Sequence, residues 1–468
     1  MSDADDATFL AGLQAHVGAT GTAVASRDAV NEPMIRHWCD AMEDANPNYT
    51  DPEHASGGPH GALAAPPTML NAWTMLGNIA RILDPNDPQG GVNAKLDAAG
   101  YVGVVATNSE HVYKRYLHPG DLLTSKQKLV EVSEEKQTGL GIGHFVTTET
   151  EYYDQTGEHV GSMFFRILKF RPGTGRPAAA TAGGVERPKR PRPSSNPDSE
   201  WFWEGCRERE LRVQTFSDGT TVYPPMVRNP RTGEMPDTPA WQVSSGRGSL
   251  YSYAIPHHPQ VPAFDYPLVV GLVELEEGVR VVSNVVDCTP AQVEVGMPLE
   301  VCWLQADDDV VLPQFRPARP ERRTTTRTFD EVTVGEKLPL CPIPITPTLI
   351  VSAAIASRDY QAVHHDRDDA HNKGSKDIFM NILTSSGLSG RYINDWAGPD
   401  AVFKNLKLRL GAPNYPYDTM TLSGSVTNKE IVDGEGIVTI AYQGLNSLGA
   451  HVTGTADIAL PLVALARS

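Results

Sequence analysis

Asp359 and His364 stand five residues apart in the stretch SRDYQAVHHD. A carboxylate and an imidazole held together can handle one water molecule, because the carboxylate accepts a proton while the imidazole orients the water and passes a proton on. Addition of water to an activated double bond also needs hydrogen-bond donors for the enolate oxygen that develops. The free N–H groups at the start of the next helix, at Asn381, Ile382 and Leu383 in DIFMNILTSSG, are the candidate donors.

The two side chains cannot share one face of a helix. Five residues turn an α-helix by about 500°, which leaves the two positions about 140° out of alignment. The helix must therefore end near Tyr360, so that the following loop returns His364 to Asp359. The spacing alone also fits a plainer interpretation, in which Asp359 caps a helix and His364 lies on the surface.

A second, altered copy of this pattern occurs near the N-terminus in EDANPNY, residues 43–49. The copy keeps Asp44 but has Tyr49 where a histidine would complete the pair. Tyrosine has a reference pKa of about 10 and is a poor proton shuttle at neutral pH. We predict that this copy is catalytically silent; a second active site built on Asp44 and Tyr49 is the alternative.

Composition excludes several classes of protein. The net charge of −17 argues against a nucleic-acid binder, although a local basic lip could still hold an anionic ligand such as coenzyme A. The apolar runs have the length of strands and are too short to cross a bilayer, and the acidic N-terminus lacks the features of a signal peptide. No CxxC pair occurs among the cysteines, so we expect a soluble protein of the reducing cytoplasm. The five cysteines are Cys39, Cys206, Cys288, Cys302 and Cys341.

Two irregular segments divide the chain. Residues 171–199 are rich in Pro, Gly, Ala and Ser, and residues 313–328 are short and basic. These predicted linkers leave three domains, 1–170, 200–312 and 329–468. The basic residues of the linkers are most simply solvated spacers, with a docking role as the alternative.

The outer two domains share one order of elements, in which apolar helices precede four long strands. This order predicts an α+β fold with a helix packed on a curved sheet, duplicated within one chain. The middle domain has short strands punctuated by Gly and Pro, which predicts a small β-barrel. The predicted outer elements are helices at 31–47, 66–83, 346–360 and 378–396, and strands at 108–116, 121–133, 141–153, 158–170, 402–410, 419–432, 435–446 and 449–460.

The last domain resembles the MaoC-type (R)-specific enoyl-CoA hydratases, whose hot-dog fold wraps a sheet around a long helix. Their signature is G-D-x-N-P-x-H, of which R-D-Y-Q-A-V-H keeps Asp359 and His364 and replaces Asn-Pro by Gln361-Ala362. The resemblance implies that Asp359 and His364 form the catalytic pair. The family's His-Gly, which supplies the oxyanion amide, corresponds to Asn381-Ile382. The first domain resembles the dehydratase-like half of the same superfamily, so the two halves are expected to form a pseudo-dimer.

The middle domain resembles an acyl-CoA-associated OB-fold family that begins with a four-cysteine zinc ribbon. Residues 215–235 stand where the ribbon belongs and contain no cysteine, which predicts a metal-free remnant. We expect no cofactor other than the coenzyme A of the substrate. The family's place beside thiolase-like enzymes implies a docking role toward an aldolase, by analogy alone.

The order of domains resembles the two subunits of the bacterial steroid side-chain hydratases, fused into one chain. That resemblance implies hydration of a steroid enoyl-CoA with a three-carbon side chain at the D-ring, followed by retro-aldol cleavage. A general (R)-specific 2-enoyl-CoA hydratase and a non-catalytic acyl-CoA-binding scaffold for an aldolase are the alternatives. The source of the steroid and the oligomeric state, including a homodimer, stay open.

Overall fold

The computed structural model describes residues 3–77, 87–175 and 188–462. The chain forms two compact units, one made by Met1–Thr181, Glu321–Pro339 and Ile343–Ser468, the other by Ala182–Pro320 and Leu340–Pro342.

The first unit contains two halves, each with helices that precede a run of long strands. The first half comprises α1 (Asp3–Gln14), β1 (Val24–Ala25), α2 (Glu32–Met42), α3 (Pro47–Thr50), α4 (Pro52–Ser56), the 3₁₀ helix η1 (Pro67–Thr74), α5 (Pro88–Ala98), β2 (Gly103–Tyr113), β3 (Thr124–Val132), β4 (Lys136–Gln137), β5 (Ile142–Tyr153) and β6 (His159–Phe170). The second half comprises η3 (Phe329–Glu331), β15 (Lys337–Ile345), α7 (Pro347–Ala356), η4 (Ala362–His364), α8 (Arg367–Asn372), α9 (Ile382–Ala397), β16 (Val402–Leu410), β17 (Asp418–Val432), β18 (Glu435–Asn446) and β19 (Gly449–Leu460).

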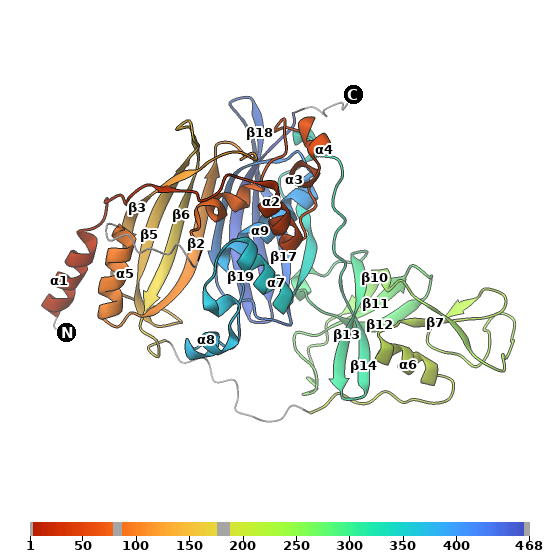
Figure 1. Cartoon of the computed structure of the whole chain (residues 1–468). Helices are drawn as coiled ribbons and strands as arrows, with labels where there is room; N and C mark the ends of the chain where they lie inside the picture. Colours follow the sequence, from red (N-terminus) through yellow and green to blue (C-terminus); the bar gives the residue numbers. More distant parts are fainter. Residues whose placement is uncertain (1–2, 78–86, 176–187, 463–468) are drawn as a thin grey trace. The chain divides into compact units, whose positions relative to one another are not determined.

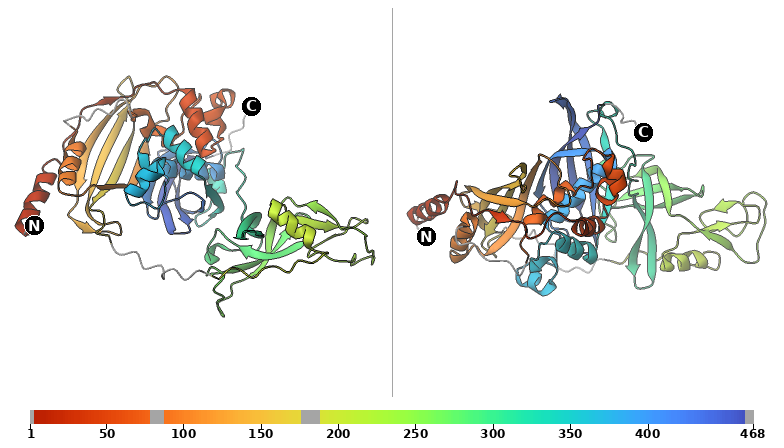
Figure 2. Two further views of the ribbon diagram at one scale, coloured as in Figure 1. Left: turned by 60° about the horizontal axis from the view of Figure 1, so that its bottom comes forward. Right: turned by 45° about the horizontal axis from the view of Figure 1, so that its top comes forward.

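The strands of both halves form one 11-stranded sheet in the order β1-β3-β5-β6-β2-β16-β19-β18-β17-β15, with β4 beside β5 (Figures 1 and 2). The halves join where β2 and β16 pair antiparallel, from Asn405 opposite Val112 to Arg409 opposite Asn108. This continuous sheet confirms the predicted intrachain pseudo-dimer of two hot-dog domains.

The sheet forms because its strands alternate buried and more exposed side chains, the period of two that one covered face requires. In β5 the buried positions include Val146, Thr148 and Tyr152, and the residues between them are half-buried. One face of the sheet is therefore part of the core, and the helices of both halves gather there.

Helix α9 is the central element of the second half, and every residue of it except Asp395 is buried. A helix that is buried all round belongs to a core. Glycines let its neighbours approach closely. A Cβ at Gly387 would lie 2.9 Å from Sδ of Met42 in α2, and a Cβ at Gly390 would lie 3.0 Å from Cγ2 of Thr68 in η1. Helix α9 therefore packs directly against the helices of the first half.

The second unit is a closed five-stranded barrel with a small sheet beside it. The barrel order β10-β11-β12-β14-β13 confirms the predicted OB-fold domain, and the small sheet has the order β8-β7-β9. Trp201 and Phe202 of α6 join Leu250, Val273 and Phe315 in its core. The elements are α6 (Glu200–Glu208), β7 (Arg212–Thr215), β8 (Thr221–Val222), β9 (Ala240–Val243), β10 (Arg247–Ala254), β11 (Val269–Leu275), β12 (Arg280–Val285), η2 (Pro290–Gln292), β13 (Pro298–Asp307) and β14 (Val310–Pro317).

The linker boundaries differ from those the sequence predicts. Strand β14 continues to Pro317, inside the segment 313–328, because its prolines stand in a barrel strand whose ladder tolerates them. In the segment 171–199, residues 176–187 lie outside the described residues. Beyond them the chain contacts the barrel, where Lys189 pairs with Asp307 at 2.5 Å. Lys189 therefore contacts the barrel, although its side chain stays 67% exposed to solvent.

Two predicted helices are placed differently. The one expected at 66–83 is the short 3₁₀ helix η1, and residues 78–83 lie outside the described residues. The one expected at 378–396 begins only at Ile382, where Asn381 is the N-cap.

Candidate active site

The end of α7 places the carboxylate of Asp359. Arg358 adopts a left-handed backbone conformation with φ of 59°, and the N–H of Asp359 donates to the carbonyl of Ala354 at 2.9 Å. A left-handed residue just past the last turn is a common way to end a helix, because it lets the next amides bond back to free carbonyls. The chain therefore leaves the helix before Tyr360, which permits the return that the sequence requires.

The short 3₁₀ turn η4 brings His364 back toward Asp359. Nδ1 of His364 lies 2.7 Å from the carbonyl oxygen of Phe379, and the Phe379 ring stands edge-on to the imidazole with centroids 5.1 Å apart. Since a carbonyl can only accept, Nδ1 carries the hydrogen, and Nε2 is left to face Asp359. Nε2 lies 3.4 Å from Oδ2 of Asp359. That separation is longer than an ordinary hydrogen bond, so both groups can contact one water molecule.

Asn381 connects this pair to α9. Its Oδ1 accepts from the backbone N–H of Thr384 at 2.8 Å and from the hydroxyl of the same residue at 2.6 Å. Its Nδ2 donates to Oδ2 of Asp359 at 3.1 Å and to Oγ of Ser357 at 3.0 Å. The same side chain thus caps one helix and holds the carboxylate that follows another.

The site is largely buried and keeps a negative charge. The side chains of Asp359 and His364 are 15% and 9% exposed. Burial by itself would raise the pKa of Asp359, but hydrogen bonding and charge from His364, together with the amide of Asn381, hold that pKa below its ordinary value. Asp359 is therefore a carboxylate at neutral pH and can accept a proton.

The predicted oxyanion donors stand at the start of α9. Ile382 and Leu383 occupy its first turn and Asn381 is its N-cap. The first N–H groups of a helix have no partner within it, and the helix dipole favours negative charge there. The side chain of Asn381 links this helix start to Asp359, and the role of the three amides as oxyanion donors stays a prediction.

The altered copy has the same backbone turn but different surroundings. Glu43 has φ of 52°, and Asp44 donates its N–H to the carbonyl of Cys39 at 2.8 Å. Burial raises the pKa of Asp44 and raises that of Tyr49 well above its usual range. The hydroxyl of Tyr49 accepts from Nδ2 of Asn394 at 3.0 Å. The Tyr49 hydroxyl is therefore a poor proton shuttle at neutral pH.

The end of α9 binds to this copy. Asn46 and Asn48 both donate side-chain N–H groups to the carbonyl of Pro399, at 3.1 and 2.8 Å. Arg391 is 2% exposed, and its NH1 donates to the carbonyl of Met42 at 2.6 Å. No sequence pattern predicts these contacts, because each joins residues about 350 positions apart. The altered copy is thus a contact surface for the second half.

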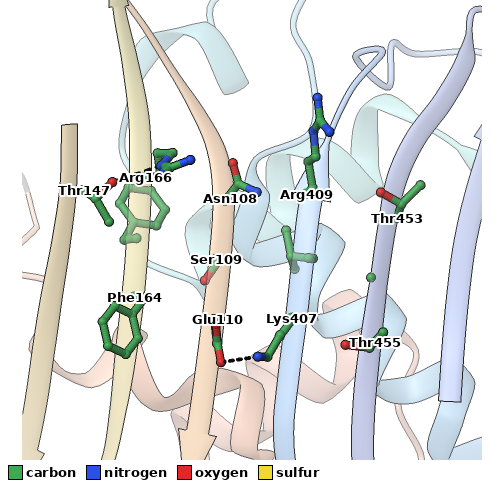
Figure 3. A pocket seen from close by; sticks show the side chains of 13 residues that line it. Asn108, Ser109, Glu110, Thr147, Phe164, Arg166, Lys407, Arg409, Thr453 and Thr455 are labelled. Carbon is green, nitrogen blue, oxygen red and sulfur yellow. Dashed lines mark hydrogen bonds and ion pairs between the residues drawn. The ribbon is translucent and has the colours of Figure 1, made fainter. Parts of the chain in front are cut away.

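A trough with a volume of about 530 Å³ opens on the face of the sheet that is opposite the helices (Figure 3). It lies where β2 and β16 join the two halves. Lys407 and Glu110 form an ion pair of 2.7 Å in it, and Arg166 and Arg409 also line it. Neither Asp359 nor His364 lines this trough. It is therefore separate from the candidate active site.

The described residues meet the requirements neither of a metal site nor of a membrane-spanning helix. Within residues 3–77, 87–175 and 188–462, no cluster of three or more His, Cys, Asp or Glu side chains is arranged to hold a metal ion. No helix in the same residues is long and apolar enough to span a membrane.

Two family descriptions match parts of this chain. Residues 15–163 match the family described as "FAS1-like, dehydratase domain region". Residues 241–304 match the family described as "ChsH2, C-terminal OB-fold domain".

Curated relatives match large and small parts of this chain over most of their own length. A protein of Thermomonospora curvata named "Probable enoyl-CoA hydratase alpha subunit" is 41% identical over 67% of this chain and 97% of its own length. The alpha subunit of the 3-oxo-4,17-pregnadiene-20-carboxyl-CoA hydratase of Mycobacterium tuberculosis is 40% identical over 60% of this chain and 89% of its own. The beta subunit of that hydratase is 52% identical over 27% of this chain and 95% of its own.

A solved structure titled "MaoC-like dehydratase" has the same fold, with a TM-score of 0.54. It is 15% identical and covers 96% of this chain and 100% of its own. At that identity the likeness concerns the fold alone.

Proposed function

Because the chain belongs to the MaoC-like enoyl-CoA hydratase family and carries a ChsH2-type OB-fold domain, we propose that this hydro-lyase acts on a steroid enoyl-CoA. Water adds to the double bond of a three-carbon side chain at the D-ring and gives a tertiary 17-hydroxy acyl-CoA. One observation carries the proposal: a single chain resembles both subunits of a hydratase named for a pregnadiene-carboxyl-CoA.

The chemistry begins with one water held between Asp359 and His364. The Asp359 carboxylate accepts a proton from this water as its oxygen bonds to the β-carbon of the enoyl thioester. Nε2 of His364 orients the water, because the bond from Nδ1 to Phe379 fixes the ring. A proton from the pair then reaches the α-carbon, so that the net change is the addition of one water.

The thioester oxygen becomes negative as the water adds. In this proposal, backbone amides of Asn381, Ile382 and Leu383 at the start of α9 donate to this oxygen, and the dipole of a 16-residue helix adds to their effect. Loss of such a donor typically costs about 10²–10³ in rate.

We also propose a partner for the barrel domain. A tertiary 3-hydroxy acyl-CoA is the substrate a retro-aldol cleavage needs, so a thiolase-like aldolase consumes the product. A curated scaffold protein of Methanocaldococcus jannaschii is 29% identical over 23% of this chain and 77% of its own length, which supports a docking role for the domain.

The test compares a steroid enoyl-CoA with crotonyl-CoA. We expect the steroid thioester to gain the mass of one water and lose its enoyl absorbance, much faster than crotonyl-CoA at equal concentration. The Thermomonospora curvata relative is named for no particular acyl chain, which keeps a general enoyl-CoA hydratase as the second candidate. Equal or faster turnover of crotonyl-CoA favours that candidate, and absence of turnover with both substrates refutes hydration.

A further inference from the structure

We propose that the side chain of Asn381 is a positioning residue that fixes the Asp359 carboxylate beside the N-terminus of α9. The proposal rests on the hydration proposed above. The sequence suggests only that the backbone N–H of Asn381 is an oxyanion donor. The role proposed here belongs to the side chain of Asn381.

The hydrogen bonds of Asn381 leave its amide one orientation. A side-chain amide has two N–H donors and two acceptor lone pairs. Both donors are used, on Asp359 and Ser357, and both acceptor positions are used by Thr384. A flipped amide would place its oxygen against the carboxylate and its NH₂ against the N–H of Thr384. Asn381 is also 3% exposed, so water cannot replace these partners.

The contact with Asp359 bears on the chemistry because of the oxygen it uses. Asn381 donates to Oδ2, the same oxygen that lies 3.4 Å from His364. Among the described residues, the other oxygen, Oδ1, accepts a long bond of 3.4 Å from the N–H of Gln361. Asn381 therefore determines the rotation of the carboxylate, and with it the direction of the lone pairs that meet water.

The same contact fixes the distance between two parts of the site. Ser357 and Asp359 follow α7, whereas the candidate oxyanion amides begin α9. One buried side chain bonds to both segments. A displacement of about 1 Å between reacting groups can cost about 100-fold in rate, so this link matters for turnover.

The plainer interpretation makes Asn381 only a helix cap, and two substitutions separate the roles. Serine and aspartate cap helices about as well as asparagine. Asn381→Ser keeps an acceptor for Thr384 but removes the donor to Asp359. Asn381→Asp also keeps the cap, and it places a second carboxylate against Asp359. Thr384→Val is the matched control, because it removes one bond to the cap and leaves Asp359 untouched.

We expect Asn381→Ser to lower kcat by about 10- to 100-fold with a small change in Tm. Asn381→Asp should move the acidic limb of kcat/KM upward, because two adjacent carboxylates share a proton. Thr384→Val should lower Tm, reduce kcat less than Asn381→Ser does, and leave the pH profile as in the parent, because the N–H of residue 384 still orients the Asn381 amide. Profiles of both Asn381 variants that superimpose on the parent, or a loss of kcat equally large in Thr384→Val, overturn the proposal.

A second measurement keeps this test separate from the choice of substrate. Carboxyl ¹³C titration of aspartate-labelled protein, with the Asp359 signal assigned through Asp359→Asn, needs no turnover. We expect the pKa of Asp359 to rise in Asn381→Ser and to rise further in Asn381→Asp. An unchanged titration overturns the positioning role. A parent that hydrates neither thioester overturns the proposed function, and the titration still decides the role of Asn381.

Discussion

Asp359→Asn separates the chemistry of the site from its shape. An asparagine has the outline of the aspartate, so its oxygen can still accept from Asn381. Because Asn381 and His364 both face Oδ2, the NH₂ of the asparagine takes the place of Oδ1, next to the N–H of Gln361. The variant therefore keeps the bond from Asn381, loses the long bond from the N–H of Gln361, and loses the group that accepts the proton of water.

The expected loss follows from that single change. Removal of a general base costs about 10²–10⁴ in rate, which is about 3–5 kcal/mol of activation free energy. The free energy of unfolding should change by less than about 1 kcal/mol, because the bond from Asn381 is retained and only the long bond from Gln361 is lost. The assay follows the enoyl thioester absorbance at saturating substrate, with thermal unfolding measured on the same samples.

The matched control is Asp366→Asn. Asp366 caps α8 two residues after His364, and its Oδ1 accepts from the N–H groups of Asp368 and Asp369. Asparagine caps equally well, so rate and stability should both be preserved. A folded Asp359→Asn enzyme within about threefold of the parent rate would refute the assignment of Asp359 as the proton acceptor.

Three further predictions concern stability and are checked by chemical denaturation. Arg391→Ala should lower the free energy of unfolding by about 2–4 kcal/mol, because it leaves a cavity and removes the donor to the buried carbonyl of Met42. Arg391→Met should lower it by less, because methionine refills the volume. Gly387→Ala should lower the free energy of unfolding by about 1–3 kcal/mol, because its Cβ would lie 3.0 Å from the ring of Trp38. An unchanged free energy of unfolding would mean that α2 and α9 move apart easily. Burial lowers the pKa of His451 from 6.5 to about 4, so the unfolded chain takes up the proton first. Stability should therefore fall as pH drops from about 6.5 to about 4, and His451→Gln should flatten that decline.

The sequence predicted the long strands to within a few residues, because alternating side chains reveal a strand directly. It also predicted that Asp359 and His364 meet, since the turn angle of a helix excludes any other way to bring them together. Helix α5 was missed because its sequence, PQGGVNAKLDA, has two glycines and little apolar periodicity.

The supporting residues could not be predicted. The role of the Asn381 side chain depends on how two helix ends approach, which no spacing encodes. Arg391 and Asn394 contact residues of the other half, and a single sequence does not pair positions so far apart. The prolines of β14 suggested a break in the chain, although the barrel uses them within a strand.

The antiparallel pairing of β2 with β16 has a practical consequence for anyone who divides this protein. A cut between residues 318 and 328 would release two polypeptides, each with a long unprotected strand edge whose natural complement is on the other piece. When the two pieces are produced together, they should reassemble into an active enzyme. When either piece is produced alone, it should aggregate through its exposed strand edge. The protein is thus suited to a split-enzyme reporter, in which each piece is fused to a tag. Activity then returns only when the two tags bring the pieces into contact.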